Sequence, residues 1–118
     1  MFARQSAGDF GEDVATAHLE RHGYRIVARN FRTRFGEVDI IAANERFLLF
    51  VEVKTRGMNA RVSGAEAVDA RKQARLRMAA EEYLMENQMQ LQPRFDVICV
   101  ETARSGQVAA VNWIENAF

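Results

Sequence analysis

Apolar and polar positions recur along the chain in patterns that predict two helices and five strands. A first helix is predicted over residues 5–22, and Gly23 follows it as a C-terminal cap residue. Residues at spacings of three and four share one face of this helix, namely Gly8, Glu12, Ala15 and Leu19. Runs bounded by turn residues predict strands at 24–31, 36–42, 47–54, 94–100 and 108–114.

A second helix is predicted between the third and fourth strands. A loop over residues 55–63 precedes it, Ser63 and Glu66 have the spacing of a capping box, and the helix runs to about Asn87. The resulting order α-β-β-β-α-β-β predicts an α/β fold, with a mixed central sheet flanked by helices and one crossover through the second helix. A length of 118 residues fits one domain spanning residues 1–118.

The third predicted strand is unusual because two charged residues interrupt its apolar run. In the sequence LLFVEVK, Glu52 and Lys54 are two residues apart, so they project from the same face of a strand. Glu37 and Asp39 have the same spacing in the preceding strand. An ion pair between Glu52 and Lys54 on an exposed edge strand is one explanation. The apolar flanks favour another, in which these groups form a functional site.

The loop between these two strands decides which acidic residues face each other. A four-residue loop starting at Asn44 places Asp39 opposite Glu52, whereas a two-residue loop places Glu37 opposite Glu52. In either register, all four charged groups lie on one face. Carboxylates at such close range repel each other, and bound Mg²⁺ would relieve the repulsion because it prefers oxygen ligands. Lys54 would add positive charge beside the metal.

The chain carries two short runs that resemble the motif of the PD-(D/E)XK nuclease superfamily, Gly36-Glu37-Val38-Asp39 and Phe50-Val51-Glu52-Val53-Lys54, with Val38 in place of the motif's proline. It is more closely similar to the YraN-like bacterial proteins, a largely uncharacterised group that resembles archaeal Holliday-junction resolvases. Further runs that carry this resemblance cover nearly the whole chain: Gly11-Glu12, Asn30-Phe31-Arg32, Arg94-Phe95-Asp96-Val97 and Glu115-Asn116-Ala117-Phe118.

The resemblance implies a restriction-endonuclease-like core and a site that uses Mg²⁺ or Mn²⁺. Asp39 and Glu52 would be metal ligands, and the main-chain carbonyl of Val53 would be a third. Lys54 would position the attacking water and stabilise charge on the phosphate.

Two further acidic residues are candidates for the same site. The resemblance implies that Glu12 reaches it from the first helix, where the small and apolar residues on its face suit close packing against a sheet. A capping role is the alternative for Glu12, because Asp9 precedes it by three residues. Glu37 is a second-tier candidate that would only flank the metal.

Basic residues are unevenly distributed although the net charge is zero. Fourteen of the sixteen are arginines, whose planar guanidinium suits phosphate, and five of these fall within residues 21–34. Contacts to a nucleic-acid backbone are therefore expected from Arg29, Arg32, Arg34, Arg56 and Lys72. A solvated arginine-rich surface, with Lys72 on a solvated helix face, explains the same pattern.

The composition also bears on location. No run approaches the roughly 20 apolar residues that a membrane helix needs, so no membrane partner is expected. The first residues lack the apolar core of an export signal. Cys99 is the one cysteine and lies in an apolar strand, where burial is expected and no disulfide within the chain can form. A cytoplasmic location fits these features.

Three functions fit these observations. The first is a metal-dependent nuclease that hydrolyses DNA phosphodiesters, for which the resolvase resemblance implies branched or junction DNA, and cutting two strands would favour a homodimer. The alternative is a nucleic-acid-binding module of the same fold with little or no catalytic activity. The third is an interaction domain without a nucleic-acid partner, which predicts no salt-dependent DNA binding.

Overall fold

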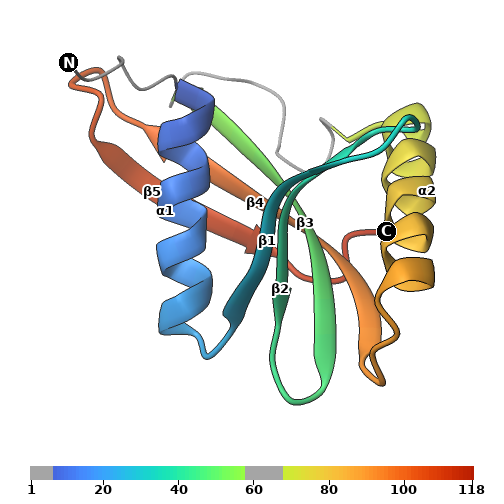
Figure 1. Cartoon of the computed structure of the whole chain (residues 1–118). Coiled ribbons are helices and arrows are strands. Elements are labelled where there is room, and N and C mark those ends of the chain that lie inside the picture. Colours follow the sequence, from blue (N-terminus) through green and yellow to red (C-terminus); the bar gives the residue numbers. More distant parts are fainter. Residues whose placement is uncertain (1–6, 58–67) are drawn as a thin grey trace, which may run out of the picture.

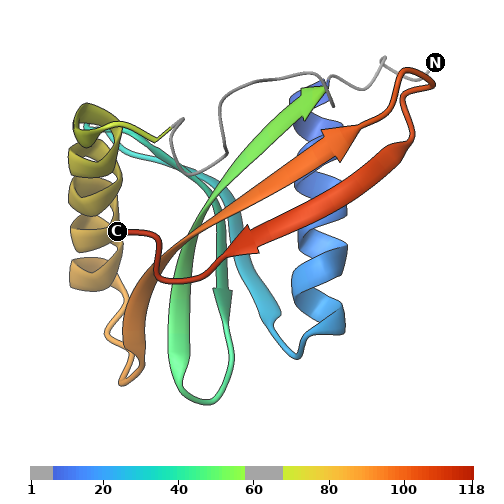
Figure 2. The same ribbon diagram turned by 180° about the vertical axis from the view of Figure 1, so that it is seen from behind.

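A five-stranded mixed sheet organises the computed structural model, which describes residues 7–57 and 68–118. The elements follow the chain in the order α1 (Ala7–Arg21), β1 (Arg25–Arg32), β2 (Glu37–Ala43), β3 (Phe47–Gly57), α2 (Ala70–Glu86), β4 (Gln92–Thr102) and β5 (Val108–Ile114). The strands lie side by side in sequence order; β3 and β4 are parallel, and the other neighbours are antiparallel. Figures 1 and 2 show this arrangement from opposite directions. The predicted α/β class and element order are confirmed.

The two helices cover opposite faces of the sheet. Consecutive residues of β3 accordingly alternate between two hydrophobic clusters, one on the side of each helix. Leu48 and Phe50 pack in the cluster on the α2 side, whereas Leu49 and Val51 pack in the cluster on the α1 side. All four are at most 1% exposed. A strand that is buried on both faces is apolar throughout. The two charged residues that interrupt β3 immediately after this stretch therefore need a local explanation.

β2 and β3 separate beyond the pair of Ile40 and Val51, and we call this place the divergence point. Their ladder runs from the pair of Ala43 and Leu48 to the pair of Ile40 and Val51, while β3 remains paired with β4 as far as Gly57. Past the divergence point, β3 ends near the start of α1, and the beginning of β2 lies toward α2 (Figure 1). The edge of β3 that faced β2 is thereby left with main-chain groups that need other partners.

A local twist accompanies this separation. Asn30 on β1 has a φ of 53°, a left-handed conformation that asparagine tolerates better than most residues. Val38 packs on the α2 side and Ile40 on the α1 side, although a regular strand keeps residues two apart on one face. The alternation of β2 therefore breaks at Asp39, the residue between them.

Strands β3 and β4 are longer than predicted. Residues 55–57, expected in a loop over 55–63, belong to β3 because they stay paired with β4, and the rest of that expected loop lies outside the described residues. β4 spans Gln92–Thr102 rather than 94–100, and the remaining strands differ from the prediction by at most one residue at either end. The parallel pairing of β3 with β4 thus includes the charged end of β3 and keeps it extended.

The second helix begins later than predicted. It does not extend from Ser63, because Asp69 is not helical and α2 starts at Ala70. The N-cap is Asp69, whose side chain accepts the main-chain N–H of Lys72 at 2.9 Å. The predicted capping box of Ser63 and Glu66 lies outside the described residues. Lys72 consequently belongs to the first turn of α2.

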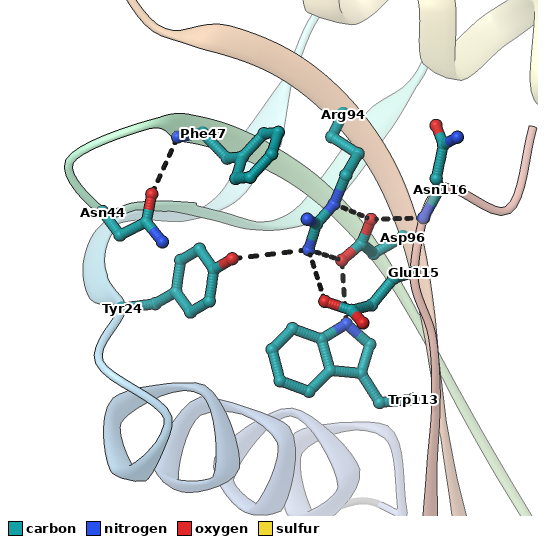
Figure 3. A network of polar contacts seen from close by, with 8 residues as sticks. All are labelled: Tyr24, Asn44, Phe47, Arg94, Asp96, Trp113, Glu115 and Asn116. Atoms are coloured by element: carbon teal, nitrogen blue, oxygen red, sulfur yellow. Dashed lines mark hydrogen bonds and ion pairs between the residues drawn. The ribbon is translucent and has the colours of Figure 1, made fainter.

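A buried polar network lies on the α1 side of the sheet, around the beginning of β4 (Figure 3). Asp96 is fully buried, and each of its oxygens accepts two hydrogen bonds. Arg94 donates from Nε at 2.9 Å and Nη2 at 2.8 Å, the indole of Trp113 donates at 2.8 Å, and the main-chain N–H of Asn116 donates at 3.0 Å. Arg94 also reaches the Tyr24 hydroxyl, at 3.4 Å. We refer to this group as the Arg94–Asp96 network.

Candidate metal centre

Asp39 occupies the divergence point, and its carboxylate is directed toward β3. Its Oδ2 accepts the main-chain N–H of Val53 at 2.8 Å, in place of the partner that a continued ladder would supply. The N–H and the C=O of one strand residue point to the same side, so the Val53 carbonyl faces this open edge as well. A carboxylate and a main-chain carbonyl are thus brought to one corner of the sheet.

If the ladder between β2 and β3 continued by one more pair, Glu52 would be the residue opposite Asp39. Ala43 pairs with Leu48, so four residues, 44–47, lie between the last paired residues of the hairpin, as one of the two predicted registers requires. The Glu52 side chain lies on β3 and is only 5% exposed. The hairpin therefore places a second acidic residue beside the first, in a position where water screens its charge poorly.

Both lysines of the chain meet at Glu52. The ammonium Nζ of Lys54 lies 3.4 Å from Glu52 Oε1, and Lys72 of α2 forms a closer ion pair with the same oxygen. We call Asp39, Glu52, Lys54 and Lys72 the carboxylate–lysine cluster. From the sequence, Lys72 is expected at a nucleic-acid backbone or on a solvated helix face. The structure places its ammonium group within the cluster instead.

The electrostatics of the cluster reflect burial and crowding. Burial raises the pKa of Asp39 to about 7, the charge of Glu52 adds to the rise, and the hydrogen bond from Val53 opposes it. Burial and the neighbouring Lys72 lower the pKa of Lys54. Burial also acts to lower the pKa of Lys72, but its contacts with Glu52 and Lys54 and the charge of Asp39 outweigh this, so its pKa is raised. The two carboxylates are therefore close enough to repel each other.

The donor atoms at this corner suit a small, hard cation. Asp39, Glu52 and the Val53 carbonyl offer oxygen only, which Mg²⁺ and Mn²⁺ accept and zinc uses less often. Within residues 7–57 and 68–118, histidine, cysteine and acidic side chains do not gather in a metal-binding group of three or more. Mg²⁺ commonly binds through one or two carboxylates and retains several waters, so two carboxylates are compatible with such a site.

Glu12 approaches the divergence point from the opposite face of the sheet. A Cβ atom at Gly11 would lie 1.9 Å from Thr55 Oγ1, so only glycine allows α1 to lie this close to β3. The Glu12 carboxylate pairs with Arg29 at 3.4 Å, and its charge contributes to the raised pKa of Asp39. The capping alternative is wrong, because Asp9 already lies inside α1. Glu12 is therefore a neighbour of the cluster and not a third ligand in this arrangement.

The regular alternation of a strand predicts that Glu37 lies on the same face as the other charged groups. In the structure, Glu37 does not join them. Its carboxylate pairs with Arg32, directly opposite on β1, at 3.3 Å. This follows from the break in alternation at Asp39. Among the arginines expected at a nucleic-acid backbone, Arg29 is also engaged, since it pairs with Asp13 at 2.9 Å as well as with Glu12.

Arg34 and Arg56 are placed differently from these two. The guanidinium of Arg34 lies over the ring of Phe35, 4.9 Å from its centre, and the residue is exposed. Arg56 is half-buried near the end of β3, two residues beyond Lys54. Arg56 thus lies on the strand that carries the cluster, and Arg34 lies in the turn that leads into β2.

A pocket of about 330 Å³ adjoins the cluster, at the start of α2. Its lining comes from the turn before β2 and from the first two turns of α2: Gly36, Glu37, Asp69, Arg71, Lys72, Arg75 and Leu76. Arg71 and Arg75 are not among the binding residues predicted from the sequence. The signal that could have found them is the N-cap at Asp69, because it makes Arg71, Lys72 and Arg75 neighbours in the first turns of a helix.

The fold and the cluster together define a class of protein. A mixed sheet in which an aspartate, a glutamate and a lysine meet where two strands separate is a restriction-endonuclease-like core of the PD-(D/E)XK kind. The chain belongs to the uncharacterised protein family UPF0102, whose profile matches residues 11–100. This family is a member of the PD-(D/E)XK-like nuclease superfamily, so the resemblance inferred from the sequence is confirmed.

Several curated proteins of this family align with nearly the whole chain. A UPF0102 protein of Syntrophotalea carbinolica is 47% identical over 99% of this chain and 94% of its own length. UPF0102 proteins of Alkaliphilus oremlandii and Moorella thermoacetica are each 41% identical, over 94% and 98% of this chain and 96% and 97% of their own lengths. These names state a family and no activity. In the described part of the chain, neither helix has the length and apolar character needed to cross a membrane.

Proposed function

We propose that this protein is a metal-dependent nuclease that hydrolyses phosphodiester bonds in DNA. The observation that carries the proposal is the meeting of Asp39 and Glu52 with Lys54 at the divergence point, in a poorly solvated place where the two carboxylates repel each other. Structural ion pairs do not need such repulsion. A site for a divalent cation does, because negative charge is what attracts the ion.

Each residue of the site has a role in this proposal. Asp39, Glu52 and the Val53 carbonyl would hold Mg²⁺ or Mn²⁺, and the bound ion would lower the pKa of the water that attacks phosphorus. Lys54 lies beside Glu52, where its ammonium group orients that water by hydrogen bonding and offsets the negative charge that builds on the phosphoryl oxygens. Glu12 remains a nearby acidic group that limits the mobility of Arg29.

Contacts to the DNA backbone come from the basic residues around the cluster. Arg71 and Arg75 line the pocket beside Lys72, and Arg56 lies further along β3. These groups bind phosphate by charge and do not read sequence. Arg29 and Arg32 contribute less, since acidic neighbours already occupy them. A preference for branched DNA and a homodimer that cuts two strands rest on the resolvase resemblance, and a cytoplasmic setting fits the buried free thiol of Cys99.

The test is cleavage of junction, flap and duplex DNA by the full chain in Mg²⁺ or Mn²⁺. Asp39→Asn and Glu52→Gln keep the shape of each side chain and remove its charge, so each should lower the cleavage rate by about 10²–10³-fold or more. Glu45→Gln, in the exposed loop between β2 and β3, is the matched control and should cut as the parent does. A parent protein that binds metal and DNA yet cuts none of the three would overturn the proposal.

One observation favours the alternative of a DNA-binding module with little catalysis. Glu12, the acidic residue expected to complete the site from α1, is paired with Arg29. A non-catalytic module would bind DNA with a steep salt dependence, and this binding would be unchanged in Asp39→Asn. If the protein is a nuclease, the parent cuts DNA and the same variant binds DNA without cutting it.

A further inference from the structure

We propose that Lys72 is an internal counter-cation of the metal site, which holds the cluster together without metal and moves away from Glu52 when a divalent cation binds. This inference rests on the proposed metal site and names a role for a residue outside the Asp…Glu-x-Lys motif. In this role Lys72 competes with the metal for Glu52 and, once displaced, is positioned to bind a phosphate.

The ammonium group of Lys72 lies at the acidic part of the cluster. Lys72 contacts Glu52 Oε1 more closely than Lys54 does, although Lys54 is a neighbour on the same strand. Its charge also acts on Asp39, where it opposes the rise in pKa. One ammonium group therefore offsets both carboxylates, which is the electrostatic task assigned to the metal. A divalent cation held by the same two residues would repel this group strongly.

The side chain of Lys72 has more room to move than that of Lys54. Lys54 projects from β3, which is paired with β4 throughout this region, and its side chain is 27% exposed. Lys72 projects from the first turn of α2, its side chain is 39% exposed, and it lines the pocket of about 330 Å³. The ammonium group can therefore turn from Glu52 into that pocket without a change in the backbone.

The pocket already has other basic residues in its lining. Arg71 and Arg75 line it with Lys72, so three cations share this space with two acidic residues, next to the proposed metal site. Such a group attracts the phosphate backbone. Displacement of Lys72 from Glu52 would thus add a cation to the substrate surface at the moment when metal completes the site. Metal binding and DNA binding would become coupled through one side chain.

The test compares metal binding by the parent and by Lys72→Met, which removes the charge and keeps most of the apolar stem. Titration calorimetry with Mn²⁺ should give a tighter Kd for Lys72→Met by about tenfold, because the competing cation is gone. Without metal, the same variant should have a lower Tm than the parent, because the two carboxylates lose their counter-charge. Arg104→Met is the matched control: it also removes one positive charge, lies in the exposed turn between β4 and β5, and should leave both quantities unchanged.

A charge-preserving variant and a structure complete the test. Lys72→Arg keeps a competing cation and should bind Mn²⁺ no more tightly than the parent does. In a crystal grown with Mn²⁺, Lys72 Nζ should lie more than about 4 Å from both oxygens of Glu52, beyond ion-pair distance.

The inference and the proposed function can fail separately. If Lys72→Met binds Mn²⁺ as tightly as the parent or more weakly, the counter-cation role is wrong, whether or not DNA is cut. If the affinity rises while the parent cuts no DNA, the role stands and the nuclease proposal fails. If neither protein binds Mn²⁺, both are overturned.

Discussion

Two charged clusters lie on opposite faces of the central strands β3 and β4, and they differ in how completely their carboxylates are satisfied. In the Arg94–Asp96 network, Asp96 accepts four hydrogen bonds from nitrogen donors and is fully buried. In the carboxylate–lysine cluster, Asp39 accepts one hydrogen bond, from Val53, and faces the negative charge of Glu52. One cluster resolves its charges within the chain, and the other retains a conflict between two acids.

The difference separates a structural role from a binding role. A buried carboxylate with a full set of donors, including a bidentate arginine, holds distant segments in place. Arg94 shows the same effect, since its hydrogen bond to Asp96 raises its pKa. A buried carboxylate that faces another one stores unfavourable energy that a cation from solution can remove. Burial and charge alone therefore do not identify a site, whereas the state of the hydrogen-bonding partners does.

The largest expected effect lies in the satisfied network. Asp96→Ala leaves the buried Arg94 guanidinium without its partner and should lower the free energy of unfolding by about 3–5 kcal/mol. Urea denaturation measures this loss. Glu115→Ala is the control, because its side chain pairs with the same arginine but is 59% exposed, so it should cost less than about 1 kcal/mol. Equal losses would mean that the donors around Asp96 do not set its contribution.

A smaller effect of opposite sign is expected at Asp39 in the metal-free protein. Its pKa is about 7 in the folded chain and 3.8 in the reference state, so the folded chain keeps this proton to higher pH. Folding stability should therefore fall as the pH rises through this interval, by on the order of 2–4 kcal/mol. Asp39→Asn lacks the ionisation, so in EDTA it should be more stable than the parent at pH 8 and nearly equal at low pH.

Urea denaturation at several pH values between 4 and 8 measures this difference. Glu45→Gln, exposed in the loop between β2 and β3, should follow the parent throughout. Mg²⁺ should also stabilise the parent at pH 8 and have little effect on Asp39→Asn. A parent whose stability rises over this pH range relative to Asp39→Asn would show that the two carboxylates do not repel each other.

The smallest expected effect concerns the packing of α1 against β3 beside the cluster. Gly11→Ala would bring a methyl group against the Thr55 hydroxyl, and such overpacking should cost about 1–3 kcal/mol. Thr55→Ala removes that hydroxyl, so the double variant should recover most of the loss. Thermal unfolding of the two single variants and the double variant measures this coupling. Additive losses would mean that Gly11 and Thr55 do not contact each other closely.

Much of the fold was predictable because the chain's periodic patterns are strong. The order of elements follows from apolar spacing, and one short loop left only two registers for the hairpin of β2 and β3. Asp39, Glu52 and Lys54 could be grouped because a charged pair in an apolar strand is rare. The start of α2 was predicted too early because Ser63 and Glu66 have the spacing of a capping box. Asp69, the N-cap in the structure, is followed three residues later by Lys72 and lacks that signature.

The rest depends on groups that only the tertiary structure brings together. The pairing of Arg29 with Glu12 and the break in alternation at Asp39 come from packing between elements, and local propensity does not encode either one. Lys72 reaches Glu52 across a helix–sheet contact. The partners of Asp96 likewise come from β4, from β5 and from Asn116, the second residue after β5. Sequence spacing can suggest the reactive group, but it cannot show which donors surround it.

The convergence of both lysines on Glu52 has a practical consequence for chemical labelling. The chain contains only two lysines, at positions 54 and 72, so an amine-selective acylating reagent has its side-chain targets in one small region. Intact-mass spectrometry after brief acylation would therefore report the accessibility of that region through the adducts beyond the one that the α-amino group accepts, with no need to digest the protein. Protection by a divalent cation or an oligonucleotide would appear as a change in a single mass spectrum.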